Sequence, residues 1–404
     1  MAKILILIGA HLCTAPRPQK EALTLAQEGH DVIVRGVWFD PTLVERDRQL
    51  MAHQPYRFQP VLDFQPGRLS RLGVRLQARL ARLIFQKIGQ FTPALLGYGA
   101  KAMLQAALQE KADLTIVHSE AGLWVGDRLM QQGFRVGVDF EDWFSQDLLP
   151  EALSIRPVQR IKALEERLIQ RCTYCLTTSH ALAKALAQVY QASTPTVIYN
   201  VFPQTKFPAV VPSKPLPSLH WFSQTIGKGR GLETLFQALP LIQYPVELHL
   251  RGTCSAATQT WLESLIPLDW RSRVFLHPTV PADQLHHCIA EHDIGLALEQ
   301  TSPPSRNLTI TNKLFQYLQA GLAIVATDTA GQREVLSQYP AIGALVPSGD
   351  AVELAAAINY LLSDPVKLST AKAIAQQAAQ EIYNWEKQHH QLRHITQLAL
   401  AKEL

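Results

Sequence analysis

The chain has 404 residues, of which 47% are hydrophobic and 18% are charged, and its formal net charge is +4. This length predicts two or three domains with cores of their own, and the composition excludes a disordered chain, while the small net charge gives no reason to expect a nucleic-acid partner. Five cysteines, no apolar run of transmembrane length and a first apolar run too short for a signal peptide favour a reducing cytoplasm.

Short apolar runs alternate with helical segments from the beginning of the chain. Residues 4–8 predict a buried strand, a helix follows around 20–27 and ends at Gly29, and residues 31–34 predict the next strand. Further strands are expected at 114–117, 135–138, 174–178 and 197–199. This alternation predicts a parallel sheet with helices on both faces.

The alternation stops between residues 203 and 217, where five prolines occur, and then resumes. We interpret this stretch as an interdomain linker. Strands are expected again at 219–222, 246–250, 274–276, 294–298, 323–326 and 344–346, and long helices follow from Val352. The predicted division is therefore a domain of residues 1–202, the linker 203–217, a second domain of residues 218–375 and a C-terminal helical segment 376–404. Two doubly wound domains bind ligands at the carboxyl ends of their strands.

Residues 311–327 predict a helix followed by a buried strand. The helix begins with Asn312 and Lys313, at the end where free backbone N–H groups and the helix dipole attract anions. Gly321 is a suitable stop for this helix, and the residues that follow are apolar on both faces of the strand. A sugar diphosphate is one anion that such a helix end would bind.

The pattern of residues 312–327, NKLFQYLQAGLAIVAT, resembles the donor-binding helix of GT-B glycosyltransferases, closest to the retaining group with a glycogen-synthase-like C-terminal domain. The resemblance covers nearly the whole chain and is strongest over residues 219–347. It implies an α/β fold of two Rossmann-like, doubly wound domains facing across a cleft, and a nucleotide-diphosphate sugar bound mainly by the second domain. It also implies hexosyl transfer with retention to a polysaccharide or lipid-linked glycan, without a cofactor.

The loop after the first strand of the second domain contains candidate phosphate ligands. Gly227 and Gly229 allow the backbone to approach an anion closely, and Lys228 and Arg230 add positive charge. Such charges stabilise the leaving group when the glycosidic bond breaks. The loop resembles the family's R-x-x-KG-x-x-x-L element, with Arg230 in the register of its lysine, although the upstream arginine is absent. A solvated strand–helix turn is the alternative.

The family usually has two glutamates eight positions apart, and this chain departs from that pattern. By register with Gly321, the ribose-binding position is Gln316, whose amide still donates and accepts hydrogen bonds. The position eight residues earlier is Leu308. Glu299, at the end of its strand, is a further candidate donor ligand, and a strand-end charge facing water is the alternative.

In the first domain, candidate residues follow predicted strands. His118 resembles the histidine of the family's D-x-x-x-x-H element, which implies contact with a sugar hydroxyl. Asp142 resembles part of the D-x-H-D-x-x-S stretch, with Glu141 in place of its histidine; it could orient an acceptor hydroxyl, act as a weak base or cap a helix. Gly9 lies in the first strand–helix loop, where the family places a donor phosphate or the acceptor. This loop lacks G-x-G-x-x-G, which argues against a dehydrogenase.

Residues 68–88 predict a basic amphipathic helix without an acidic residue. Its basic residues are Arg68, Arg71, Arg75, Arg79, Arg82 and Lys87, and its apolar residues are Leu69, Leu72, Leu76, Leu80, Leu83 and Ile84. This pattern is typical of a helix on an anionic membrane surface, which would make the protein peripheral on the inner membrane face. The helix could instead pack its leucines on the sheet, or bind an anionic acceptor.

Two other functions stay open on the sequence. One is an enzyme of the same fold with another reaction, such as a nucleotide-sugar epimerase or a hydrolase. The other is a non-catalytic protein that binds a nucleotide sugar or a partner, which the altered glutamate positions favour. No metal is expected, because the pair Cys172 and Cys175 has no second pair at zinc spacing, and because the two-domain alternation argues against the metal-dependent GT-A fold.

Overall fold

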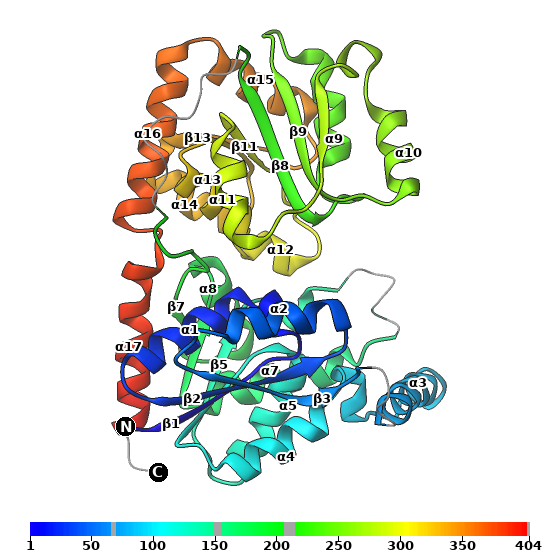
Figure 1. Ribbon diagram of the computed structural model, residues 1–404, viewed down its shortest axis with the longest axis vertical. Coiled ribbons are helices and arrows are strands. Elements are labelled where there is room, and N and C mark those ends of the chain that lie inside the picture. The colour runs from blue at the N-terminus through cyan, green and yellow to red at the C-terminus, as the bar shows by residue number, and fades with distance from the viewer. Residues whose placement is uncertain (66–69, 149–152, 154, 206–214, 402–404) are drawn as a thin grey trace. The chain divides into compact units, whose positions relative to one another are not determined.

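The computed structural model describes residues 1–65, 70–148, 153, 155–205 and 215–401 (Figure 1). The chain divides into two compact units. Unit 1 contains Met1–Ile198 and the C-terminal residues from His389, and unit 2 contains Tyr199–Gln388. Of the predicted linker 203–217, residues 206–214 lie outside the described residues.

Unit 1 contains a seven-stranded parallel sheet in the order β3-β2-β1-β4-β5-β6-β7. The strands are β1 (Lys3–Leu7), β2 (Asp31–Trp38), β3 (Arg57–Asp63), β4 (Leu114–Val117), β5 (Val136–Phe140), β6 (Tyr174–Thr177) and β7 (Thr196–Val197). The interior strand β1 is buried on both faces, and Ile4 pairs with Val32 on one side and Leu114 on the other. The sequence analysis did not predict β3, because this edge strand carries polar residues and has no continuous apolar run.

Helices cover the unit 1 sheet and extend beyond its edge strand β3 (Figure 1). They are α1 (Pro16–Gln27), α2 (Pro41–Met51), α3 (Ser70–Ile88), α4 (Ala100–Glu110), α5 (Ser119–Met130), α7 (Val158–Arg171) and α8 (His180–Tyr190), with short 3₁₀ turns η1 (Leu12–Thr14), η2 (Pro93–Leu96) and η3 (Phe144–Gln146). Helices that follow strands begin at side-chain caps where a hydroxyl or carboxylate is available. Ser179, for example, accepts a hydrogen bond from the Leu182 N–H at 3.0 Å and so starts α8.

Unit 2 contains a six-stranded parallel sheet in the order β10-β9-β8-β11-β12-β13. Its strands are β8 (Ser218–Thr225), β9 (Glu247–Thr253), β10 (Val274–His277), β11 (Ile294–Ala297), β12 (Ala323–Thr327) and β13 (Gly343–Val346). Its helices are α9 (Leu232–Ala238), α10 (Ala256–Leu265), α11 (Ala282–Ala290), α12 (Pro304–Leu308), α13 (Asn312–Ala320), α14 (Ala330–Gln338), α15 (Ala351–Leu362) and α16 (Pro365–Glu381), with η4 (Leu239–Leu241), η5 (Leu268–Trp270) and η6 (Pro340–Ile342). The last helix, α17 (Trp385–Ala401), begins among the residues of unit 2 and ends among those of unit 1.

The structure confirms the α/β prediction of two Rossmann-like domains and the helix–strand unit at residues 311–327. Helix α13 begins at Asn312 and ends at Gly321, which has the left-handed φ of 70° that favours glycine at this position. The aromatic ring of Tyr317 lies directly against β11, since a Cβ on Gly295 would be 2.3 Å from it. The Tyr317 hydroxyl also donates to the carbonyl of His220 on β8, at 3.1 Å. These contacts hold α13 on the sheet and determine where its amino end lies.

Within the described residues, no helix combines the length and the apolar content that a bilayer span requires.

Candidate functional site

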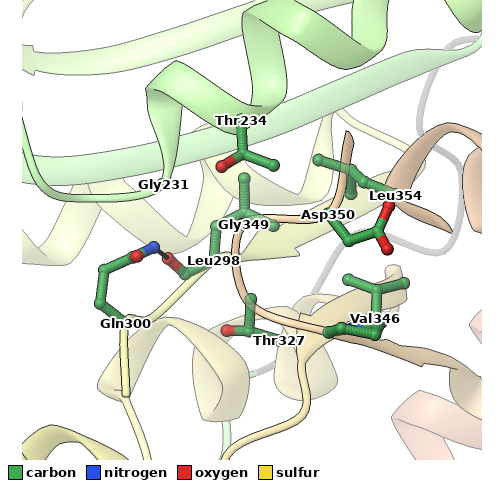
Figure 2. Close-up of a pocket in the computed structure, with 10 residues that line it drawn as sticks. Gly231, Thr234, Leu298, Gln300, Thr327, Val346, Gly349, Asp350 and Leu354 are labelled. Atoms are coloured by element: carbon green, nitrogen blue, oxygen red, sulfur yellow. Dashed lines mark hydrogen bonds between the residues drawn. The ribbon is translucent and has the colours of Figure 1, made fainter. Parts of the chain in front are cut away.

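The carboxyl ends of the unit 2 strands meet at one edge of the sheet, as parallel strands require. A small pocket at this edge is lined by residues that follow β8, β11, β12 and β13. Figure 2 shows Gly231 and Thr234 from the start of α9, Gln300 beyond β11, and Thr327 at the end of β12 around this pocket. Loops that are far apart in the sequence therefore form one surface.

Gly231 brings the glycine-rich loop into contact with Leu298, the residue that follows β11. Gly231 has a φ of 80°, and a Cβ added to it would lie 2.5 Å from both the carbonyl oxygen and the Cβ of Leu298. Only glycine suits both the conformation and the close approach. The N–H of Gly229 donates to the Glu233 carboxylate at 2.9 Å, so this donor is already used within the loop. Gly227 has open space where a side chain would be.

Two cationic side chains of this loop are exposed. Arg230 donates to the Ser223 hydroxyl at 3.0 Å, which directs its guanidinium back toward the end of β8. The Lys228 ammonium lies 5.8 Å from the centroid of the Trp261 ring. Neither forms an ion pair with any residue in the described part of the chain. Both are therefore available to an anion at this edge.

Lys313 and Glu299 form an ion pair beside the amino end of α13. The Lys313 ammonium contacts the Glu299 carboxylate and lies 3.4 Å from the Thr311 hydroxyl. The two side chains are 13% and 24% exposed, so water screens the pair only partly. Burial acts to raise the pKa of Glu299, but the charge and hydrogen bond of Lys313 outweigh it and lower that pKa. Glu299 is thus an ionised carboxylate held by Lys313, and not a strand-end charge in open water.

Gln316 presents a buried acceptor without a donor. The residue is 8% exposed, and its Oε1 receives no hydrogen bond from any residue that the structure describes. At the start of the same helix, the N-cap residue Thr311 makes no side-chain cap hydrogen bond, and Asn312 is exposed. Leaving a buried acceptor unsatisfied costs roughly 1–3 kcal/mol, which a ligand hydroxyl would recover. This arrangement agrees with the predicted ribose contact of Gln316, which stays a prediction.

In unit 1, His118 lies between two carboxylates. Its Nδ1 is 2.8 Å from Glu141 Oε1 and its Nε2 is 3.0 Å from Glu21 Oε2. The imidazole is 2% exposed, whereas the Glu141 side chain is 30% exposed. Both ring nitrogens are thus occupied, and Glu141 is the partner of His118 that reaches the surface. The predicted contact of His118 with a sugar hydroxyl is not tested by this geometry.

A network of buried charges surrounds Glu21. Arg17 donates to Asp139 at 2.6 Å and to the carbonyl of Ile198, also at 2.6 Å, and is fully buried. Burial alone would lower the pKa of His118, but the carboxylates of Glu21 and Glu141 raise it well above its usual value. Burial raises the pKa of Glu21 to about 7. Burial and then the neighbouring charge of Arg17 lower the pKa of Lys20 to about 7.

The carboxylate and imidazole atoms of Glu21, His118 and Asp139 lie within 4.8 Å of one another, as the ligands of a metal ion would. The donor set does not suit a divalent cation. The imidazole of His118, with its raised pKa, is a protonated donor to two carboxylates and has no lone pair to offer. The Arg17 guanidinium already neutralises Asp139. We interpret the cluster as an internal charge network.

The remaining predicted residues of unit 1 lie at the ends of strands. Gly9 follows β1, and a Cβ there would lie 2.8 Å from the Ser119 hydroxyl, so the loop passes close to the start of α5. Asp142 is partly exposed and follows β5 by two residues. The catalytic and acceptor roles of these residues stay predictions.

Arg17, Lys20 and Glu21 were not predicted from the sequence. A signal was present: these three charged residues lie at i, i+3 and i+4 of the helix that follows the first strand, and so share one face. That face is buried against the sheet, which is an unusual position for three charges. Their partner Asp139 is more than a hundred residues away, so local spacing could not identify the pairing.

The chain was compared with known proteins. Residues 219–364 match the family described as Glycosyl transferases group 1. No curated protein matches the chain. Similar solved structures include sucrose-phosphate synthase from Thermosynechococcus elongatus, with a TM-score of 0.73 and 17% identity over 99% of this chain and 100% of that chain. Anabaena HepE in complex with UDP and glucose has a TM-score of 0.69 and 19% identity over 98% of this chain and 100% of that chain. S. aureus TarM in complex with UDP has a TM-score of 0.71 and 8% identity over 98% of this chain and 99% of that chain. These likenesses show the GT-B fold.

Proposed function

Because residues 219–364 form a glycosyl transferases group 1 domain within a GT-B fold, we propose that the chain transfers a hexosyl group from a nucleotide-diphosphate sugar. The acceptor is a polysaccharide or a lipid-linked glycan, and transfer proceeds with retention, as the resemblance at residues 312–327 implies. HepE, a structural neighbour, was obtained with UDP and glucose, which supports a nucleotide sugar as the donor.

The diphosphate would bind at the carboxyl edge of unit 2. The observation that carries this proposal is the chain of contacts there: Gly231 abuts Leu298, and the next residue, Glu299, holds Lys313 at the start of α13. Arg230 thus projects from a loop seated beside the helix end. Cations and free helix N–H groups in one place stabilise a diphosphate leaving group without a metal ion.

The nucleoside and the sugar would bind on either side of this diphosphate. Gln316 would accept a hydrogen bond from a ribose hydroxyl through its unsatisfied Oε1. Glu299, positioned by Lys313, would accept a hydrogen bond from a sugar hydroxyl. In unit 1, His118 and Asp142 would act on the sugar and acceptor side, His118 by positioning Glu141.

Replacing Arg230 by alanine is expected to weaken binding of a UDP- or GDP-sugar by at least tenfold, since a charged hydrogen bond contributes about 1.5–3 kcal/mol. Isothermal titration calorimetry measures this change. Arg271→Ala is the matched control, because Arg271 is an exposed arginine of unit 2 before β10, at the opposite edge of the sheet, and should bind the donor as the wild type does. Equal donor affinity for wild type and Arg230→Ala would contradict the proposed diphosphate site.

Two alternatives have different products. An epimerase would release a free epimerised donor, and a binding protein would hold the donor without turnover. The binding protein is favoured by one observation, that Leu308 and Gln316 occupy the family's glutamate positions. Incubation with UDP- and GDP-sugars and a membrane extract separates the three: sugar attached to an acceptor supports the transferase, and the anomeric configuration of that product, read by NMR, tests retention.

We also propose that the acceptor is reached at an anionic membrane surface through α3. Arg68 and Leu69 of the predicted helix lie outside the described residues. The described leucines do not pack on the sheet: Leu72 is 71% exposed and Leu76 is 58% exposed. The alternative in which these leucines pack on the sheet is therefore wrong, and an exposed apolar face beside arginines suits a lipid surface.

Replacing Arg75, Arg79 and Arg82 by glutamine is expected to weaken binding to phosphatidylserine-containing vesicles roughly 100-fold, because each basic residue contributes about 1 kcal/mol near an anionic surface. Vesicle sedimentation measures the bound fraction. The control is Lys111→Gln, Lys162→Gln and Lys184→Gln, which removes the same charge from exposed positions of unit 1 outside α3. If both triple variants lose affinity equally, net charge and not α3 is responsible, and this part of the proposal is wrong.

A further inference from the structure

A cavity of about 240 Å³ lies beneath α3 in unit 1, among α3, β3, η2 and α4. Small residues create it. Half of its lining residues are alanine or glycine: Ala78, Ala94, Gly97, Gly99, Ala100 and Ala102. Since α3 lies beyond the edge strand β3 (Figure 1), this space is at the rim of the sheet and not in its core. It is separate from the charge network of His118 and from the site of unit 2.

The cavity has both apolar and polar walls, and Gln77, Tyr98 and Gln105 are among its polar lining residues. Leu62 on β3 and Val74 on α3 contribute branched apolar side chains. Lys101 on α4 also lines the cavity, is exposed, and forms no ion pair with any residue within the described ranges. A hollow that combines apolar walls with polar groups and a cation suits a molecule with a hydrocarbon part and an anionic part.

The helix over the cavity has three different faces at 100° per residue. The inner face carries Val74 and Ala78, which line the cavity. The outer face carries the exposed Leu76 and Leu80, 58% and 48% accessible to solvent. The arginines lie on the flank between them, and Arg75 lies over the ring of Phe64 at 5.7 Å. A helix that contacts a bilayer with its outer face places the cavity behind it, one helix diameter of roughly 10 Å further from the lipid chains, beside the headgroups.

We propose that this cavity is a lipid site, in which one hydrocarbon chain of an anionic membrane lipid lies between α3 and α4 while its phosphate pairs with Lys101. The site extends the membrane contact of α3 and does not depend on sugar transfer. A chain withdrawn from the bilayer into the protein would hold unit 1 at the surface more specifically than charge alone, because burial of each methylene adds affinity that salt does not screen.

The test uses the full chain and dodecyl phosphate below its micellar concentration, with binding measured by calorimetry. Ala102→Phe fills the cavity from the first turn of α4, and we expect its affinity for dodecyl phosphate to be at least tenfold lower than that of the wild type. Lys101→Gln is expected to lower affinity about fivefold, and Lys162→Gln, an exposed lysine on α7, not at all. Inorganic phosphate should not compete, because the chain supplies most of the affinity.

Two further measurements keep the inference falsifiable. Ala102→Phe should retain the thermal unfolding midpoint of the wild type within a few degrees, and its initial binding to anionic vesicles, which uses the outer face of α3. Ala102→Phe should also bind the donor in unit 2 as the wild type does. If the wild type itself does not bind a donor, the proposed function is refuted and this inference stays intact. Unchanged affinity of Ala102→Phe for dodecyl phosphate, or equally tight binding of inorganic phosphate, would overturn the lipid site.

Discussion

Lys313→Met is expected to lower kcat/KM for the nucleotide sugar at least 100-fold. The substitution removes the cation at the amino end of α13 and leaves Glu299, a mostly buried carboxylate, without its partner. A diphosphate would then meet an unpaired carboxylate where the wild type offers a lysine–glutamate ion pair. Loss of a single preorganised group that stabilises developing charge typically costs about 10²–10³ in rate. Steady-state kinetics with varied donor measure this ratio.

The effect of the lost charge on catalysis can be separated from its effect on stability. Lys372→Met is the matched control, since Lys372 also pairs with a partly buried carboxylate, that of Asp293 at 2.7 Å. This aspartate is 25% exposed, as Glu299 is 24%, but it precedes β11 and so lies at the opposite edge of the sheet. Lys372→Met should lose some stability and keep its kcat/KM. The double variant Lys313→Met with Glu299→Gln should recover stability relative to Lys313→Met, because no unpaired carboxylate remains, yet stay impaired in transfer. If Lys313→Met keeps kcat/KM within threefold of wild type, α13 does not hold the diphosphate.

His118→Phe is expected to lower the free energy of unfolding by about 3 kcal/mol at pH 6, the loss typical of breaking a buried ion pair. The variant leaves Glu21 and Glu141 facing an apolar ring in place of an imidazolium. Urea unfolding of wild type and variant at a series of pH values measures the difference. A control is His118→Phe with Glu21→Gln, which should recover part of the loss because the fully buried carboxylate is then neutral.

The pH dependence of this difference has a definite sign. The pKa of His118 in the folded protein is raised above its unfolded value near 6.5, so the folded state binds its proton more tightly. The stabilisation is complete below about pH 6.5 and is lost as the pH rises through the folded pKa of His118. The advantage of the wild type over the variant should therefore shrink as the pH rises above about 6.5. A difference that grows with pH would show that His118 is neutral in the folded protein.

Several features of the fold could be predicted from short segments because the physical cause is local. The strands β1 and β12 are buried on both faces, and a strand buried in this way is a continuous apolar run that can be recognised in the sequence. The start of α13 at Asn312 and its stop at Gly321 follow from residues at the ends of that helix. In contrast, β3 was missed, because an edge strand pairs on one side only and can be polar.

In the candidate site too, the positions of residues along the chain could be predicted, but their contacts could not. Arg230, Lys228 and Lys313 were identified from their place after a strand or at the start of a helix. Their partners were not: the contact of Lys313 with Glu299 depends on how α13 packs beside β11. The Ser223 contact of Arg230 depends on how the loop folds back toward β8.

The order of residues along the chain by itself determined the α/β class, the alternation of strands and helices, and the positions of the glycines and cations, since these depend on propensity and period over a few neighbours. Only the tertiary structure decided that the leucines of α3 face outward, that His118 lies between two carboxylates, and that Arg17 neutralises Asp139. Whether a side chain is buried or exposed, and which charge faces it, is determined by segments distant in the chain, and the energy of a buried charge depends on that partner.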